Sequence, residues 1–389
     1  MNNKTVKILS YILVAALASA LTFGATAMLE EKPIVTNSKL EALQQLLEDR
    51  FIGDVDETVI IDAAASAMVD ALGDRWSYYI SAAEYAAFDE DKKNAYVGIG
   101  VTVTSSNQQE GLLITVVNPD GPADKAGIQI NDVVVGVDGK DVRKLDTTAI
   151  SNMIRGEIGT QVAITVLREG KELTLTVTRD TVKTVVAEGQ MLEDGIGLVS
   201  IKNFNTGCAD ATIAAVESLL KQGAEKLIFD VRNNGGGYSH EMTDTLDYLL
   251  PEGLLFRTVD YEGKESRVES DAKCLDIPMV VLINENSYSA AEFFAAALWE
   301  YGAAKTVGVK TVGKGYYQVT FRLNDGSAVG LSIGKYFTPQ GKNLQNVGIT
   351  PDYPAPVETD VANAILSGVL KGKEDPQILA AMNVLKDWE

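Results

Sequence analysis

Residues 196–301 alternate between short apolar runs and helix-length segments, and this alternation restricts the fold more than any other feature. The apolar runs are 196–201, 226–231 and 278–283, and the helix-length segments are 208–222, 240–250 and 289–301. Runs of this length with branched side chains are typical of buried strands. Strands that alternate with helices build βαβ units, in which helices pack on the sheet. The pattern predicts an α/β core over 183–357, which ends in a hairpin around Asn324-Asp325-Gly326.

A second unit, predicted over 93–182, precedes this core. Its strands are expected at 98–103, 112–117, 133–137, 162–167 and 173–177, with a helix at 146–156. Asp138-Gly139 is a hairpin turn signal. The segment Gly98-Ile99-Gly100, next to an apolar strand, can offer free N–H groups to a peptide carboxylate while the peptide adds to the sheet edge. The alternative is that the glycines only make the end of this strand more flexible and that the segment binds no ligand.

Both ends of the chain outside these units are predicted to be helical. Leucines recur on one face after residue 38, and the pattern continues at 59–72. Ser81-Ala82-Ala83-Glu84 is a capping box that starts another short helix. The predicted helical domain covers 38–92, and a helical segment covers 358–389.

The first 37 residues are predicted to be an export signal or a membrane anchor. Lys4 and Lys7 precede 22 residues without charge, Ile8 to Leu29, which is long enough to span a bilayer. We expect a single N-terminal span in the cell membrane, with the catalytic part outside the cytoplasm. Cleavage after Ala25-Thr26-Ala27, which would give a secreted protein, is the alternative.

Composition excludes several partners and cofactors. The net charge of −20 would be repelled by nucleic acid. One histidine and two cysteines are too few for a structural zinc site, no EF-hand spacing occurs, and we expect neither a metal nor another cofactor. Nothing in the sequence brings Cys208 and Cys274 within bonding range, so two free, buried thiols are expected. A disulfide between them is the alternative.

Ser289 lies where the strand that ends at Ile283 gives way to a helix. A serine there has an exposed hydroxyl beside free backbone N–H groups. It needs a base, and the chain has one histidine, His240. The alternative role of Ser289 is that of a helix N-cap, unless Ser287 caps instead.

Lys314, between two glycines, is a different base, because Ser–Lys pairs are a variant of the serine-hydrolase arrangement. Burial can lower a lysine pKa enough for the amine to accept a proton. Gln318 lies four residues on, and we expect Lys314, Tyr316 and Gln318 to share one face of a strand. The alternatives are a solvated lysine and a polar strand residue. A phosphate loop ending at Lys314 fails, because Gly315 follows where Ser or Thr is needed.

The glycines at 235–237 follow a strand and would let N–H groups approach a ligand, as an oxyanion hole requires. An ordinary turn is the alternative. His240, just beyond this loop, would be the general base if the chain were a Ser–His hydrolase instead.

In its ordered motifs over 38–355 the chain resembles the C-terminal processing peptidases, the tail-specific protease group of serine peptidases, with an inserted PDZ domain. The motifs are Gly73-Asp74-Arg75-Trp76-Ser77, Gly98-Ile99-Gly100-Val101, Gly121-Pro122-Ala123-Asp124-Lys125-Ala126-Gly127-Ile128, Asp230 to Gly237, Ser287 to Glu292, Gly313-Lys314-Gly315, Phe337 to Gly341 and Gly348 to Asp352. The resemblance implies a PDZ β-sandwich-like domain before an α/β serine-peptidase core, in an α+β chain of several domains with helical ends.

The resemblance also implies site roles: Ser289 is the nucleophile, Lys314 the general base and Gln318 the residue that orients the lysine. The implied oxyanion hole is the N–H of Ala290 with that of Gly236 or Gly237.

Three departures from the family pattern leave this trio intact. Gly235 replaces proline, Tyr288 replaces alanine and Ala291 replaces serine. They bear on the shape of the neighbouring pocket.

The resemblance implies an exported endopeptidase that cleaves proteins near C-termini bound by the PDZ domain, which can gate the active site. Arg168 is a candidate for that coupling, and a solvated strand residue is its alternative. The helical ends are candidate segments for a homodimer, or they pack against the core. The rival from another class is an inert PDZ adaptor or scaffold.

Overall fold

The computed structural model describes residues 38–105 and 111–388, which belong to two compact units divided between Ala67 and Met68. The predicted signal or anchor at 1–37 lies outside the described residues. Within the ranges that are described, no helix combines the length and apolarity needed to cross a bilayer.

The first unit contains α2 (Ser38–Arg50) and the beginning of α3 (Glu57–Asp70), as predicted. The side-chain amide of Gln44 donates to the carboxylate of Glu57 at 2.9 Å. The predicted leucine face is exposed at Leu40, Leu43 and Leu46. The pattern therefore predicted the helix correctly, but not burial of its apolar face among the described residues.

The core of the second unit is a sheet with strand order β10-β11-β12-β15-β16-β19. β10 pairs antiparallel with β11, and the other neighbours pair in parallel. The strands are β10 (Ala187–Met191), β11 (Ile196–Ile201), β12 (Lys226–Asp230), β15 (Met279–Ile283), β16 (Ala304–Gly308) and β19 (Tyr353–Pro354). β11, β12 and β15 match the predicted apolar runs.

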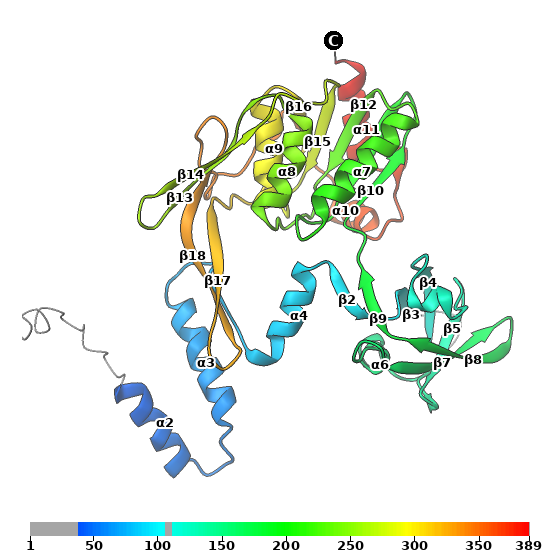
Figure 1. Ribbon diagram of the computed structural model, residues 1–389, viewed down its shortest axis with the longest axis vertical. Helices are drawn as coiled ribbons and strands as arrows, with labels where there is room; N and C mark the ends of the chain where they lie inside the picture. The colour runs from blue at the N-terminus through cyan, green and yellow to red at the C-terminus, as the bar shows by residue number, and fades with distance from the viewer. Residues whose placement is uncertain (1–37, 106–110, 389) are drawn as a thin grey trace, which may run out of the picture. The chain divides into compact units, whose positions relative to one another are not determined.

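Helices cover both faces of this sheet (Figure 1). One face packs on α7 (Cys208–Lys221), α8 (Ser239–Leu249) and α9 (Ala290–Glu300). The other packs on α11 (Pro376–Lys386). Successive strand residues alternate between the two cores: Phe229 and Val281 lie in the first, and Ile228 and Val280 in the second. Because both faces are buried, the strands are continuous apolar runs.

A second sheet carries the hairpin predicted at residues 319–333. Strand β18 (Ala328–Phe337) pairs with β17 (Tyr316–Arg322) along one edge, and with β1 (Tyr78–Ile80) and β13 (Gly253–Asp260) along the other. β13 continues to β14 (Glu265–Ser270). β1, β13 and β14 were not predicted.

The predicted PDZ unit is a sheet of order β3-β4-β5-β7-β8 over a core of its own. At the predicted turn, Asp138 and Gly139 both have positive φ (48° and 75°), as a two-residue hairpin turn requires. The elements are β2 (Ala95–Gly98), β3 (Val101–Ser105), β4 (Leu112–Val117), α5 (Pro122–Lys125), β5 (Val133–Val137), β6 (Lys140–Asp141), α6 (Thr147–Ile154), β7 (Gln161–Arg168), β8 (Lys171–Thr178) and β9 (Asp180–Lys183).

The remaining helices are α4 (Ala82–Lys92), α10 (Thr359–Leu366) and the 3₁₀ turn Gly372–Glu374. α4 begins with the predicted capping box of Ser81 and Glu84. Cys208 and Cys274 are free thiols as expected, but only Cys208 is buried, because Cys274 lies in an exposed loop.

Candidate active site

Ser289 is held in a strained turn between β15 and α9. Its backbone angles, φ 58° and ψ −127°, are unfavourable for a residue with a side chain and cost about 1–3 kcal/mol. The buried hydroxyl of Ser287 braces the turn, donating to the carbonyl of Val231 at 2.7 Å and accepting the N–H of Asn284 at 3.0 Å. Ser289, not Ser287, is therefore the N-cap of α9. A cap in so strained a conformation also points to a chemical role.

Glu292, one turn into α9, ties this turn to the segment that carries Lys314. Its carboxylate is fully buried. Oε2 accepts the N–H groups of Ser289 at 3.1 Å and Lys314 at 2.8 Å. Oε1 accepts the N–H of Gly313 at 2.8 Å and the hydroxyl of Thr311 at 2.5 Å. Burial raises the pKa of Glu292, and these four donors oppose that shift because they favour the ionised form.

The amine of Lys314 lies over two aromatic rings. Its Nζ is 4.6 Å from the ring centroid of Trp76 and 5.8 Å from that of Tyr288. Burial lowers the pKa of Lys314 to about 8, and the charge of Lys92 adds to the effect. Arg75 also lowers the pKa, whereas Asp74 and Glu292 raise it. A large fraction of the amine is therefore neutral near pH 8, as a general base must be.

Gln318 lies on β17 and borders the same cavity as Lys314. Its Nε2 donates to the hydroxyl of Ser332 at 2.8 Å and to the carbonyl of Tyr316 at 3.3 Å. The amide is thus held by its nitrogen, and Oε1 accepts no hydrogen bond from the residues that the structure describes. Tyr316 borders a different cavity, so the face predicted for Lys314, Tyr316 and Gln318 does not include Tyr316.

The glycine loop after β12 lies directly against the serine turn. A Cβ on Gly236 would lie 2.7 Å from the Cβ of Ser289 and 2.9 Å from the nitrogen of Ala290, so only glycine fits. The side-chain oxygen of Asn234 accepts the Gly236 N–H at 2.8 Å. Within the described part of the chain, the N–H groups of Gly237 and Ala290 donate no hydrogen bond. Of the two candidate glycines, Gly237 is therefore the one with a donor to spare.

The nucleophile and base candidates border one cavity of about 630 Å³. Its lining includes Ser289, Lys314, Gln318, Gly235, Gly237 and Trp76. His240 is not part of the lining: its side chain is 66% exposed and stacks on Tyr238 with ring centroids 5.3 Å apart. The geometry therefore favours lysine over histidine as the base.

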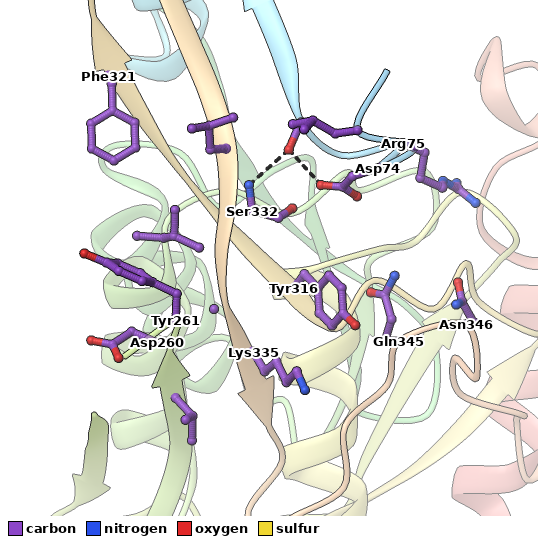
Figure 2. A pocket seen from close by; sticks show the side chains of 17 residues that line it. Asp74, Arg75, Asp260, Tyr261, Tyr316, Phe321, Ser332, Lys335, Gln345 and Asn346 are labelled. Atoms are coloured by element: carbon purple, nitrogen blue, oxygen red, sulfur yellow. Dashed lines mark hydrogen bonds between the residues drawn. The ribbon is translucent and has the colours of Figure 1, made fainter. Parts of the chain in front are cut away.

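A larger cavity of about 1020 Å³ lies around β18 and contains neither Ser289 nor Lys314 (Figure 2). Figure 2 shows Tyr261 and Phe321 on one side of that strand. The hydroxyl of Ser77 donates to Asp74 at 2.7 Å and accepts the N–H of Ser332 at 3.1 Å, which ties the loop before β1 to β18. We place the chemistry in the smaller cavity, because it holds the nucleophile and base candidates.

In the PDZ unit, Ile99 and Gly100 have the expected open N–H groups, whereas Gly98 belongs to β2 and pairs with Asp180 of β9. The carbonyl of Ile99 accepts the N–H of Ala123 at 2.8 Å, and that of Gly100 accepts the N–H of Asn118 at 2.9 Å. The N–H groups of Ile99 and Gly100 have no acceptor in the described residues. They precede β3, which is an edge strand of its sheet.

Arg168 is not a solvated strand residue. Its guanidinium makes two bonds of 2.7 Å to the carboxylate of Asp132, which is 1% exposed, and a third of 2.7 Å to the carbonyl of Gly127. All of these contacts lie inside the PDZ unit.

Three residues that shape the site were not assigned roles from the sequence: Trp76, Asn234 and Glu292. The indole N–H of Trp76 is buried without an acceptor among the described residues. Ser289-Ala290-Ala291-Glu292 is a capping-box pattern, so the link from Ser289 to Glu292 could have been found. The hydrogen bonds from residues 311–314 to Glu292 join segments that are distant in the chain, so no local sequence pattern predicts them.

Comparison with known proteins finds two domains in the chain. Residues 96–178 match the model of the PDZ domain, and residues 195–355 match that of peptidase family S41. The carboxy-terminal processing protease CtpA of Bacillus subtilis is 30% identical over 356 residues, covering 88% of this chain and 76% of that protein. A probable CtpA-like serine protease of Staphylococcus saprophyticus is 32% identical over 320 residues, covering 81% of this chain. The chain spans 64% of the length of that relative.

Among solved structures, a putative S41 protease from Bacteroides fragilis has a TM-score of 0.53. It is 17% identical, and the match covers 88% of this chain and 96% of that one. This likeness concerns the fold alone. The predicted order of a PDZ domain before a peptidase core is given by the two family matches.

Proposed function

The chain belongs to peptidase family S41 and is a relative of the carboxy-terminal processing proteases, and we propose that it is a serine endopeptidase that cleaves proteins near their C-termini. One observation carries most weight: Ser289 and Lys314 donate their backbone N–H groups to the same buried oxygen of Glu292 and border one cavity. A serine in a strained turn beside a lysine of lowered pKa is suited to acyl transfer.

In the proposed mechanism, Ser289 Oγ attacks the scissile carbonyl carbon while its proton passes to the neutral amine of Lys314. The N–H groups of Ala290 and Gly237 stabilise the oxyanion. The intermediate collapses, the C–N bond breaks, and Lys314 gives its proton to the leaving amine. Water, deprotonated by Lys314, then attacks the acyl-enzyme. The ester bond breaks, Lys314 returns the proton to Ser289 Oγ, and the new carboxyl terminus is released. Gln318 Oε1 accepts a bond from the amine of Lys314 and orients it.

The PDZ domain supplies substrate selection in this proposal. The terminal carboxylate binds the N–H groups of Ile99 and Gly100, and the peptide adds to the free edge of β3. Arg168 couples the bound peptide to activity through the loop between Gly127 and Asp132, which its guanidinium holds.

The proposed location is outside the cytoplasm. Residues 8–29 either anchor the protein in the membrane or are removed, and two copies pair through the helical ends. These parts of the proposal rest on sequence alone.

The test uses the full chain and a folded protein with an unstructured tail, followed by intact-mass spectrometry. We expect fragments shortened from the C-terminus, with cleavage reduced at least about a thousandfold in Ser289→Ala and Lys314→Ala. Amidation of the substrate's C-terminus should slow cleavage, because it removes the charge that the N–H groups bind. An adaptor would bind the tail and leave its mass unchanged, and that result would refute the peptidase.

A further inference from the structure

Gly235 and Tyr288 fit each other beside the proposed nucleophile. The φ of Gly235 lies outside the left-handed region, so its backbone conformation is open to other residues. A Cβ at this position would nevertheless lie 2.6 Å from Oη and 2.8 Å from Cζ of Tyr288. Glycine is therefore required here by the tyrosine ring and not by the turn.

Contacts with Trp76 and with the loop that carries Gly235 hold Tyr288 in place. The ring of Trp76 packs against it, with centroids 5.5 Å apart and planes inclined by 31°. The backbone N–H of Tyr288 donates to the carbonyl of Asn234 at 3.1 Å, and Asn234 lies in the same loop as Gly235. Because Tyr288 directly precedes the strained Ser289, its backbone has little freedom to move the ring away. The ring is thus a fixed wall of the cavity that also holds Ser289 and Lys314.

We propose that Tyr288, held between Gly235 and Trp76, selects substrates by size: its ring occupies space beside Ser289, so that small side chains next to the scissile bond are accepted and bulky ones are excluded. This inference rests on the proposed peptidase function. A side chain that meets a packed wall forces a shift of ring or backbone, and a shift at this point displaces the reacting carbonyl from Ser289.

The first test compares two peptides that differ only in the residue before the cleaved bond, alanine in one and phenylalanine in the other. For the unsubstituted chain, kcat/KM should favour alanine. In Tyr288→Ala, the preference should fall by at least about tenfold, because the space for the larger ring opens. Tyr261→Ala is the matched control: Tyr261 borders the larger cavity and is 77% exposed, so this variant should keep the original preference.

The outcomes separate the two proposals. If the unsubstituted chain cleaves both peptides and Tyr288→Ala leaves their ratio unchanged, the size filter is wrong and the peptidase stands. A changed ratio in Tyr261→Ala instead would assign the filter to the larger cavity and overturn the inference. If the unsubstituted chain cleaves no peptide or protein, the peptidase itself is wrong.

A second test does not depend on turnover. Gly235→Ala should lower the melting temperature, because the new methyl group overlaps the ring of Tyr288. The same substitution in a Tyr288→Ala background should have little effect. Gly236→Ala should be costly in both backgrounds, because its methyl group meets Ser289 and Ala290. An equal loss for Gly235→Ala with and without the tyrosine ring would show that the two residues are not matched.

Discussion

Ser289 and Lys314 are joined through one atom: both backbone N–H groups donate to Oε2 of Glu292, at 3.1 and 2.8 Å. The two nitrogens therefore lie within about 6 Å of each other. The link therefore holds the backbones of the proposed nucleophile and base close together. A buried carboxylate with four donors is a costly group to disturb, because each donor would be left unpaired.

We expect Glu292→Gln to lower both activity and stability. The amide replaces one acceptor oxygen with an NH₂ group that faces donors, which should lower the free energy of unfolding by about 2–4 kcal/mol. Urea denaturation and kcat/KM measure the two effects. Glu285→Gln, in the exposed part of the same loop, is the control and should match the original chain. Equal stability of both variants would contradict the role of Glu292 as a link.

Activity should rise with pH through a midpoint of about 8 and level off at higher pH. The lowered pKa of Lys314 sets this midpoint, since only the neutral amine accepts the serine proton. Below the midpoint, kcat/KM should fall about tenfold per pH unit. Lys92→Met should move the midpoint up and Asp74→Asn should move it down, because these charges lower and raise the lysine pKa respectively. A flat profile would count against a titrating lysine.

Ser289→Gly should be more stable than Ser289→Ala, although neither variant has activity. Glycine adopts the observed φ of 58° without strain, and at an N-cap it loses only a few tenths of a kcal/mol. After allowing for the greater entropy of unfolded glycine, we expect a difference of about 1 kcal/mol. Thermal unfolding of both variants measures this difference in stability. A glycine variant that is less stable than the alanine variant would mean that the backbone at Ser289 is not strained.

Arg168→Ala should destabilise the PDZ domain by about 2–4 kcal/mol, since it leaves the buried carboxylate of Asp132 unpaired. Arg143→Ala is the control within the same domain. Arg143 pairs with the exposed side chains of Asp141 and Glu172, so its loss should cost much less stability than the loss of Arg168. Denaturation of the full chain, followed through peptide binding to the PDZ domain, measures both. If Arg168→Ala changed gating at full stability, the ion pair would have no structural role.

The elements that sequence predicted best are those whose side chains follow a strong local pattern. The strand 196–201 and the hairpin turn at Asp138-Gly139 are of this kind, because burial and turn geometry leave few residue types suitable. β1 has only three residues, and β14 is charged and mostly exposed, so neither produces a clear periodicity.

The candidate site shows the same limit. The pattern around Ser289 and Lys314 is visible in the sequence, but what joins them is the contact of Glu292 with residues 311–314, which depends on the packing of α9. The packing of Trp76 beside Tyr288 likewise joins segments that are distant in the chain.

The most direct measurement of the Ser–Lys claim is labelling with a serine-reactive fluorophosphonate, followed by peptide mapping at several pH values. We predict one labelled residue, Ser289, at a rate that rises through about pH 8, with no labelling in Lys314→Met. Labelling of Lys314→Met at the original rate, or labelling of another serine such as Ser287, would contradict the account.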